Sequence, residues 1–225
     1  TTPKPGWAHC DIVGAFRRAL GVPVGFDTDV NASVLGEVTY GQARGLQTVL
    51  YLTVGTGIGL GVYVNGQLHH GILHPEGGHV LLRRHPHDRW QGRCPYHPDC
   101  LEGLASGPAI EERWGKPAAL LADREEAWAI EAYYIAQALT DYICVLAPEQ
   151  IILGGGVLHQ RQLLRLVRSE TARLLNGYLA AEALQDMDAY IVGESLGGDQ
   201  GILGCLELGR MEWEQNRKGV HDGRA

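Results

Sequence analysis

Two cysteines and a histidine recur at intervals of three residues in the segment Cys94-Pro-Tyr-His97-Pro-Asp-Cys100. Thiolates and imidazoles at such short spacing are typical ligands of tetrahedral zinc, which binds four of them in a structural site. A surface loop with two free thiols is the alternative, but the spacing favours zinc. A site with four protein ligands is closed, so its role would be structural. The candidates for the fourth ligand are His74, His79, His85 and His87.

Two glutamates flank this segment. Glu76 begins the motif Glu76-Gly-Gly-His79, and Glu102 follows Cys100 by two residues. Carboxylates just outside a closed metal site can act on something other than the metal. We therefore expect zinc to hold the two glutamates in place rather than to perform hydrolysis.

Two aspartates follow residues 22–26, whose composition predicts a short strand. Asp27 and Asp29 precede a helix for which Asn31 is the expected N-cap. Side chains at the carboxyl end of a strand often contact ligands in α/β folds, so Asp29 could accept a proton from a substrate hydroxyl. Turn and capping roles explain the two aspartates equally well.

Glycines cluster at the ends of apolar runs, as they do where a backbone turns sharply or approaches a ligand. In the cluster Thr53-Val-Gly-Thr-Gly-Ile-Gly59, several backbone N–H groups could bind one anion, with threonine hydroxyls as further donors. This is neither a Walker loop nor a dinucleotide fingerprint that opens a helix. A tight hairpin explains the cluster nearly as well. A second cluster, Gly154 to Gly156, ends the apolar run at 150–153.

The elements that must position these residues alternate between strands and helices, which indicates an α/β fold. Helices are predicted at residues 11–20, from 31, from 107, at 125–146, at 161–176 and at 201–209. Strands are predicted at residues 22–26, 150–153 and 190–192. Residues 48–73 are predicted to form an antiparallel meander with a hairpin turn at Asn65-Gly66. Residues 214–225 are polar, and we expect them to be frayed.

The 225 residues are 45% hydrophobic and 20% charged, with a formal net charge of -7. This composition is ordinary for a soluble protein, and the acidic balance argues against a nucleic-acid or membrane partner. Five cysteines, an odd number, do not suit a disulfide framework. Cys10, Cys144 and Cys205 are expected to be buried thiols, and a reducing cytoplasm fits best.

Together the motifs resemble those of the ROK family (repressors, open reading frames, kinases), and the resemblance covers almost the whole chain. The combination of Glu-Gly-Gly-His with a cysteine–histidine loop is specific to that family, whereas the glycine loops are not. In the amino-acid sequence of its motifs, the chain looks most similar to the bacterial fructokinases of the family. The motifs that follow the family's order are Asp29-Val-Asn31-Ala, Gly55-Thr-Gly-Ile-Gly59, Glu76-Gly-Gly-His79, Cys100-Leu-Glu102-Gly, Ile151-Ile-Leu-Gly-Gly-Gly-Val157 and Leu196-Gly-Gly-Asp-Gln-Gly-Ile-Leu-Gly204.

The resemblance implies an actin-like ATPase fold of the ribonuclease H-like type, and transfer of the γ-phosphoryl of Mg·ATP to the 6-hydroxyl of a hexose. It implies Asp29 as the catalytic base. The implied sugar contacts are Thr28, Asp29, Glu76, His79 and Glu102, although many members have asparagine at the position of Thr28. The implied zinc ligands are His79, Cys94, His97 and Cys100. The implied nucleotide-binding residues are Thr53, Gly55, Thr56 and Gly57 in a phosphate loop, and Gly154, Gly155 and Gly156 in an adenosine loop.

The resemblance also implies three parts: residues 1–30 from a small N-terminal domain, residues 31–195 as a large domain with a zinc loop at 79–100, and residues 196–225 as a C-terminal helix and tail. The family's first phosphate loop, Asp-x-Gly-Gly-Thr, helps to hold Mg²⁺ and does not occur in the sequence. We therefore expect a truncated chain or part of a longer protein. It would have an exposed sheet edge at residues 22–26 and little or no kinase turnover alone.

The leading hypothesis is an ATP-dependent hexose kinase that converts fructose to fructose 6-phosphate. One alternative is a fragment of a sugar-sensing ROK regulator, which would need a DNA-binding helix-turn-helix. Another is a non-catalytic remnant that binds sugar and zinc. The sequence does not decide among fructose, mannose and glucose, which differ at one or two hydroxyls. Family members are often dimers or tetramers, so a homo-oligomer is expected.

Overall fold

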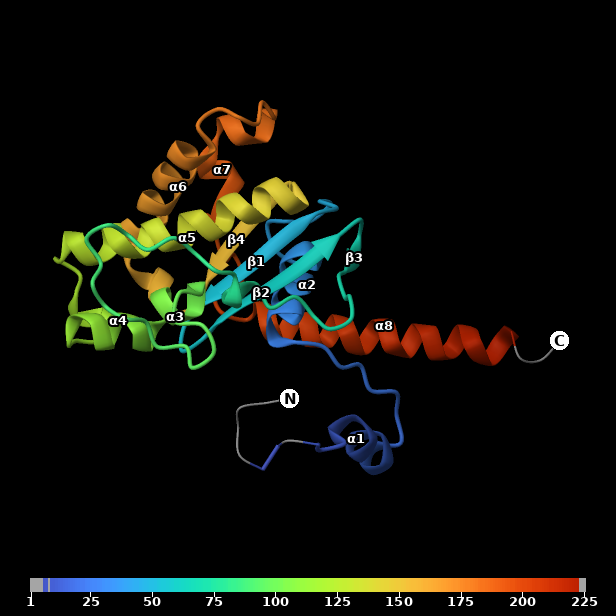
Figure 1. Ribbon diagram of the computed structural model, residues 1–225. Coiled ribbons are helices and arrows are strands. Elements are labelled where there is room, and N and C mark those ends of the chain that lie inside the picture. Colours follow the sequence, from blue (N-terminus) through green and yellow to red (C-terminus); the bar gives the residue numbers. More distant parts are fainter. Residues whose placement is uncertain (1–5, 8, 223–225) are drawn as a thin grey trace.

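The computed structural model describes residues 6, 7 and 9–222, which surround a five-stranded mixed sheet in the order β3-β2-β1-β4-β5 (Figure 1). Strand β1 pairs antiparallel with β2 and parallel with β4, and β4 pairs parallel with β5. The carboxyl ends of β1, β4 and β5 therefore lie at one edge of the sheet, where α/β folds bind ligands. The strands are β1 (Val49–Val54), β2 (Ile58–Val64), β3 (Gln67–Leu68), β4 (Gln150–Gly154) and β5 (Ile191–Gly193).

Successive side chains of β1 enter two different hydrophobic cores. Leu50 and Leu52 lie in the larger core, which includes buried residues of α3, α5 and α6, whereas Val49 and Tyr51 lie in the smaller one with residues of α2. This alternation follows from the two-residue period of a strand whose two faces are both covered. The helices are α1 (Ile12–Leu20), α2 (Asp29–Thr39), α3 (Leu101–Ala105), α4 (Gly107–Trp114), α5 (Glu125–Leu146), α6 (Arg161–Leu175), α7 (Met187–Tyr190) and α8 (Gln200–Asp222).

Two glycines allow α2 and α8 to pack closely. A Cβ at Gly36 would lie 2.2 Å from the carbonyl oxygen of Gln200, and one at Gly204 would lie 1.7 Å from that of Ala32. Real Cβ atoms do not approach backbone oxygens this closely, so both positions require glycine. Helix α2 is thereby fixed between the sheet and α8 (Figure 1).

Most of the predicted elements are confirmed, and α5 has the predicted bounds. The strand predicted at 22–26 is wrong, and so is the sheet edge expected there. This segment is an irregular connection beside α8, where a Cβ at Gly25 would lie 3.1 Å from the carbonyl oxygen of Leu208. Within the described part of the chain no strand lies beside it, and Pro23 has no N–H to donate to one.

Three smaller predictions are also wrong. Helix α2 begins at Asp29, because the N-cap is Thr28, whose hydroxyl accepts the N–H of Asn31 at 3.1 Å. Residues 214–222 do not fray but continue α8, helped by the i,i+4 ion pair between Arg210 and Glu214. The rest of that prediction, residues 223–225, lies outside the described residues. The isolated cysteines, which were expected to be buried, are exposed at all three positions: Cys10, Cys144 and Cys205.

Helix α1 lies apart from the sheet (Figure 1), and none of its residues is buried. Among the described residues, no helix combines the length and the apolar character that crossing a membrane requires. The division of the chain into three parts near residues 30 and 195 stays a prediction.

Candidate active site and metal centre

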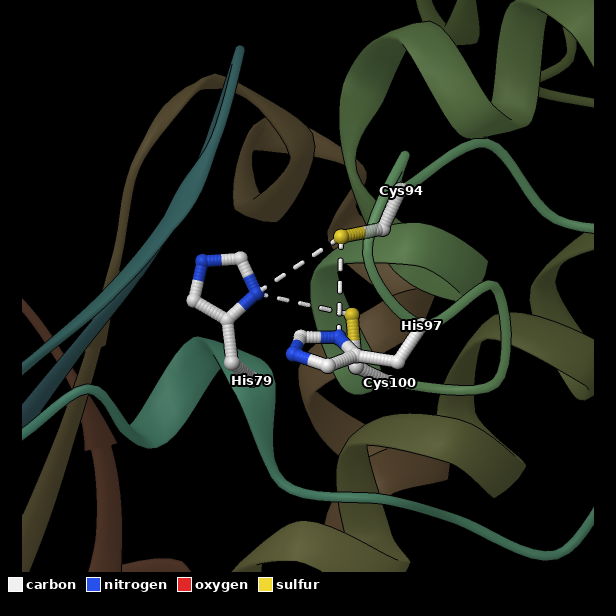
Figure 2. A group of neighbouring side chains, drawn as sticks. All are labelled: His79, Cys94, His97 and Cys100. Atoms are coloured by element: carbon white, nitrogen blue, oxygen red, sulfur yellow. Dashed lines mark hydrogen bonds between the residues drawn. The ribbon is translucent and has the colours of Figure 1, made fainter. Parts of the chain in front are cut away.

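Four side chains converge between the turn Gly77–His79 and the start of α3: His79, Cys94, His97 and Cys100 (Figure 2). Their ligand atoms all lie within 4.8 Å of one another. Nδ1 of His79 is 3.9 Å from Sγ of Cys94 and 3.5 Å from Sγ of Cys100, and Sγ of Cys94 is 3.6 Å from Nδ1 of His97. Ligands of one tetrahedral zinc ion at normal bond lengths are about 3.3–3.8 Å apart. The donor set and its spacing therefore fit zinc, with His79 rather than His74, His85 or His87 in the group.

Backbone hydrogen bonds hold the two halves of this metal centre together. The N–H of Leu101 donates to the carbonyl of Val80 at 3.0 Å, and that of Leu82 donates to Asp99 at 2.9 Å. Sγ of Cys100, the N-cap of α3, accepts the N–H of Gly103 at 3.2 Å. Burial raises the pKa of the Cys100 thiol to about 11. A cation bound here would favour the thiolate that coordination requires.

Glu102 connects the metal centre with the glycine loop between β1 and β2. Its Oε1 lies 4.0 Å from Nε2 of His79, whose other ring nitrogen faces the two cysteines. Its Oε2 accepts the N–H of Ile58 at 2.9 Å. A Cβ at Gly57 would lie 2.8 Å from the same oxygen, so the carboxylate and the loop are in close contact. The position of α3 thus constrains the conformation of the loop.

Only part of the glycine loop is left to bind an anion. The N–H of Gly55 donates to the carbonyl of Gly57 at 2.9 Å, and the N–H of Ile58 donates to Glu102. Within the described chain, the N–H groups of Thr56 and Gly57 have no hydrogen-bond partner. These two N–H groups are the donors that the loop can offer to a phosphate.

One cavity of about 370 Å³ contains several of the predicted residues: Asp29, Thr53, Gly155 and Gly156. They come from the start of α2, the end of β1 and the turn after β4. Gly155 has φ +90° and ψ 163°, and a Cβ there would lie 2.5 Å from the carbonyl oxygen of Val54. Glycine is required at this position, and it brings the turn after β4 against the end of β1.

The two aspartates that follow the 22–26 segment differ in their surroundings. The carboxylate of Asp27 is buried and accepts hydrogen bonds from Asn31 Nδ2 and from its neighbour's N–H, while His70 Nε2 lies 2.8 Å from its second oxygen. Asp27 therefore has the structural role considered for both residues. Asp29 is exposed to the cavity, and its Oδ1 accepts the N–H of Val30 at 2.9 Å.

Several predicted sugar contacts do not line this cavity. Glu76 is exposed, and its Oε1 lies 2.9 Å from Nε2 of His74. The Thr28 hydroxyl is occupied as the N-cap of α2. His79 and Glu102 lie at the metal centre, near the glycine loop.

The cavity also contains residues that the sequence interpretation did not identify, among them Tyr51, Glu194 and Gln200. The Tyr51 hydroxyl donates to Oε2 of Glu194 at 3.0 Å, and Nε2 of Gln200 donates to the same oxygen at 2.8 Å. Burial raises the pKa of Tyr51, with a further contribution from the Glu194 carboxylate, so the hydroxyl keeps its proton. Gln200 belongs to a motif that follows the family's order, but no sequence pattern distinguished Tyr51 or Glu194.

The mixed five-stranded sheet, with a cavity at the carboxyl ends of β1, β4 and β5, has the actin-like ATPase fold that the following solved structures share. The structure is similar to a ROK hexokinase from Thermus thermophilus, with a TM-score of 0.75 and 27% identity, over 90% of this chain and 70% of that one. It is also similar to a ROK family glucokinase from Streptomyces griseus in complex with glucose and AMPPNP, with a TM-score of 0.73 and 23% identity, over 94% and 76% of the two chains.

The sequence comparisons are more specific. A family profile described as ROK family matches residues 1–212. A putative fructokinase of Bacillus subtilis (strain 168) is 52% identical over 208 residues, which cover 92% of this chain and 70% of the relative. The fructokinase of Zymomonas mobilis is 44% identical over 210 residues, with coverages of 92% and 69%. The chain belongs to the ROK family.

Proposed function

We propose that the chain transfers the γ-phosphoryl group of ATP to a hexose, with fructose as the preferred acceptor. Relatives named fructokinase, at 40–52% identity, support an ATP-dependent hexose kinase. The observation that carries the proposal is the cavity in which Asp29 lies with the end of β1 and the glycine-rich turn after β4. A carboxylate beside such a turn combines a proton acceptor with backbone that a nucleotide can approach closely, which phosphoryl transfer requires.

Asp29 acts as the base. Its Oδ1 is fixed by the N–H of Val30 at the start of α2, and its second oxygen has no hydrogen bond from any described residue. That oxygen accepts the proton of the hexose 6-hydroxyl as the hydroxyl oxygen attacks the γ-phosphorus, and the bond between the γ-phosphorus and the β–γ bridging oxygen breaks, so that ADP leaves. The N–H groups of Thr56 and Gly57 bind phosphate oxygens, and the residues Gly154 to Gly156 approach the nucleotide. Mg²⁺, when bound with ATP, supplies charge neutralisation.

The metal centre supports the sugar end of the site. His79, Cys94, His97 and Cys100 would hold zinc, which would fix the His79 ring and the start of α3, and therefore Glu102. We assign hexose hydroxyl contacts to His79, Glu102 and Glu76. We also assign one to Thr28, whose hydroxyl can donate its proton to a hexose oxygen while its oxygen accepts the N–H of Asn31. With these four protein ligands the zinc would be structural and would take no part in the transfer itself.

Substitution of Asp29 by asparagine tests the proposal. The amide keeps the size of the side chain but cannot accept the hydroxyl proton, so ADP release with fructose should fall by about 10²- to 10⁴-fold. Because little or no turnover is expected of these 225 residues alone, this rate is measured with the family's first phosphate loop supplied in the same chain. Fructose binding, measured by isothermal titration, should change by less than about threefold, because hydroxyl contacts at the other residues remain. Mannose and glucose, assayed in parallel, test the preference for fructose.

Glu182→Gln, an exposed substitution in the turn Glu182–Gln185, is the matched control and should leave both measurements unchanged. Turnover retained in Asp29→Asn would remove Asp29 as the base. A wild-type chain that carries the first phosphate loop but neither binds fructose nor releases ADP with it would contradict the assignment as a hexose kinase.

A further inference from the structure

Glu194 lies where two cavities meet. It directly follows β5 and lines the 370 Å³ cavity that contains Asp29. It also lines a smaller cavity of about 130 Å³ together with Gly155 and His159. Three leucines from β4 and from the segment after it give the smaller cavity an apolar lining: Leu153, Leu158 and Leu164.

The carboxylate of Glu194 is held in a built arrangement rather than free on the surface. Its Oε2 accepts from the Tyr51 hydroxyl at 3.0 Å and from Gln200 Nε2 at 2.8 Å, and both donor residues are more than nine-tenths buried. A Cβ at Gly154 would lie 2.5 Å from this oxygen, so the end of β4 leaves room for the carboxylate. In the described part of the chain, Oε1 of Glu194 has no hydrogen-bond partner. Oε2 is therefore held by two hydrogen bonds, whereas Oε1 can accept a hydrogen bond from a ligand.

The position of Glu194 along the sheet edge indicates which part of a ligand it meets. The strand order is β2-β1-β4-β5, with Glu102 beside the β1–β2 loop, Gly155 after β4 and Glu194 after β5. A nucleotide whose terminal phosphate faces a hexose near Asp29 and Glu102 extends its nucleoside toward β5. A fixed carboxylate there repels phosphate oxygens but accepts hydrogen bonds from hydroxyls. The ribose carries two adjacent hydroxyls, and the apolar cavity beside Glu194 suits a base.

We propose that Glu194 binds the ribose hydroxyls of the nucleotide through Oε1, and that Tyr51 and Gln200 are positioning residues that fix its orientation. This inference rests on the proposed function, because it assumes that the cleft takes a nucleotide. It assigns to the nucleoside end a residue that the sequence motifs did not include.

The test compares ADP with 2′,3′-dideoxy-ADP by isothermal titration, in the presence and absence of Mg²⁺. Wild type should bind ADP about ten- to a hundredfold more tightly than the dideoxy analogue, because hydrogen bonds to a carboxylate are charge-assisted. In Glu194→Gln, which keeps an acceptor for Tyr51 and Gln200, ADP affinity should fall about tenfold or more. Affinity for the dideoxy analogue should change by less than about twofold.

Tyr51→Phe removes one of the two donors to Oε2 and should reduce the preference for ADP partially, while Glu182→Gln should leave it unchanged. Wild type that binds both nucleotides equally would overturn the ribose assignment and leave the kinase proposal standing. The assignment would also be overturned if Glu194→Gln lowered the affinity for ADP and for the dideoxy analogue equally. It would likewise be overturned if the substitution lowered ADP affinity only when Mg²⁺ is present, which would indicate a metal contact. Absence of ADP binding by wild type would overturn this inference and the proposed function together.

Discussion

At the scale of single residues, Gly155 shows how one backbone conformation shapes the cleft. Its φ of +90° and ψ of 163° fall in a region that is essentially restricted to glycine. Any side chain would also meet the carbonyl oxygen of Val54 at 2.5 Å and Oγ1 of Thr53 at 2.7 Å. Gly156, the next residue, has no atom within 4 Å of the place that a Cβ would occupy.

Gly155→Ala should therefore lower the free energy of unfolding by about 3 kcal/mol, the sum of backbone strain and overpacking. Gly156→Ala is the matched control and should change it by less than about 1 kcal/mol. Urea denaturation followed by circular dichroism measures both. Equal effects of the two substitutions would contradict the conformational argument.

Glu131 is a second residue whose surroundings predict a measurable property. It is fully buried on α5, and neither of its carboxyl oxygens has a hydrogen-bond partner among the described residues. Burial raises its pKa well above the ordinary value of 4.5, and the nearby Arg113 offsets this only partly. The folded protein therefore binds more protons at this site than the unfolded protein above about pH 4.5.

The contribution of Glu131 to stability is fully present below the unfolded pKa and is lost as pH rises through the folded pKa. Glu131→Gln lacks this titration, so its stability relative to wild type should increase between pH 4.5 and pH 8, by about 1.4 kcal/mol for each pKa unit of elevation that is spanned. Urea midpoints across this range measure the difference, with Glu182→Gln as a control that should show none. A difference that is independent of pH would show that Glu131 titrates normally.

At the scale of elements, the four side chains at the candidate metal centre show how far spacing in the sequence can predict a cluster. Cys94, His97 and Cys100 lie within seven residues, so their convergence depends on local geometry. The fourth member could not be chosen among four histidines by spacing alone, because the choice depends on how the turn Gly77–His79 packs on α3. The resemblance to the family supplied that choice, and the structure brings His79 to the group.

Cys94→Ser should reduce the zinc content from about one ion per chain to nearly none, because serine is a poor zinc ligand at neutral pH. It should also lower the thermal midpoint, since the centre joins two segments of the chain. Cys144→Ser, at an exposed position of α5, is the matched control and should change neither property. Elemental analysis and thermal denaturation measure both. Unchanged zinc in Cys94→Ser would rule out this centre.

The prediction of elements from sequence failed where tertiary contacts decide. Residues 22–26 have the composition of a strand, but they pack along α8 and meet no sheet. Glu194 had no sequence signal, because its role depends on β5 lying beside β4 and on a hydrogen bond from Tyr51, which is 143 positions away in sequence. Helix α5 was predicted with correct bounds because its apolar period and Pro148 are local features.

At the scale of the whole molecule, stability and function are unevenly distributed. The buried residues of α5 face the larger core, and the cleft residues belong to α2, β1, the segments after β4 and β5, and the start of α8. Helix α1 contributes no buried residue. Its described contacts include an ion pair between Arg17 and Glu212, whose charged atoms lie 3.6 Å apart, and the Arg17 side chain is half exposed. Exposed ion pairs contribute about 0–1 kcal/mol, so α1 should open without unfolding the rest.

Hydrogen exchange should therefore separate α1 from the remaining protein. Amides of α1 should exchange within seconds to minutes at neutral pH, whereas those of residues 130–143 in α5 should exchange only through global unfolding. Fructose with Mg·ADP should slow exchange at residues 29–39, 53–59 and 154–157, where the cleft lies, and should leave α1 unchanged. Mass spectrometry of peptides from each segment measures these rates. Protection of α1 by the ligands would show that the helix takes part in the site, because a helix with no buried residue gains protection only from a new contact.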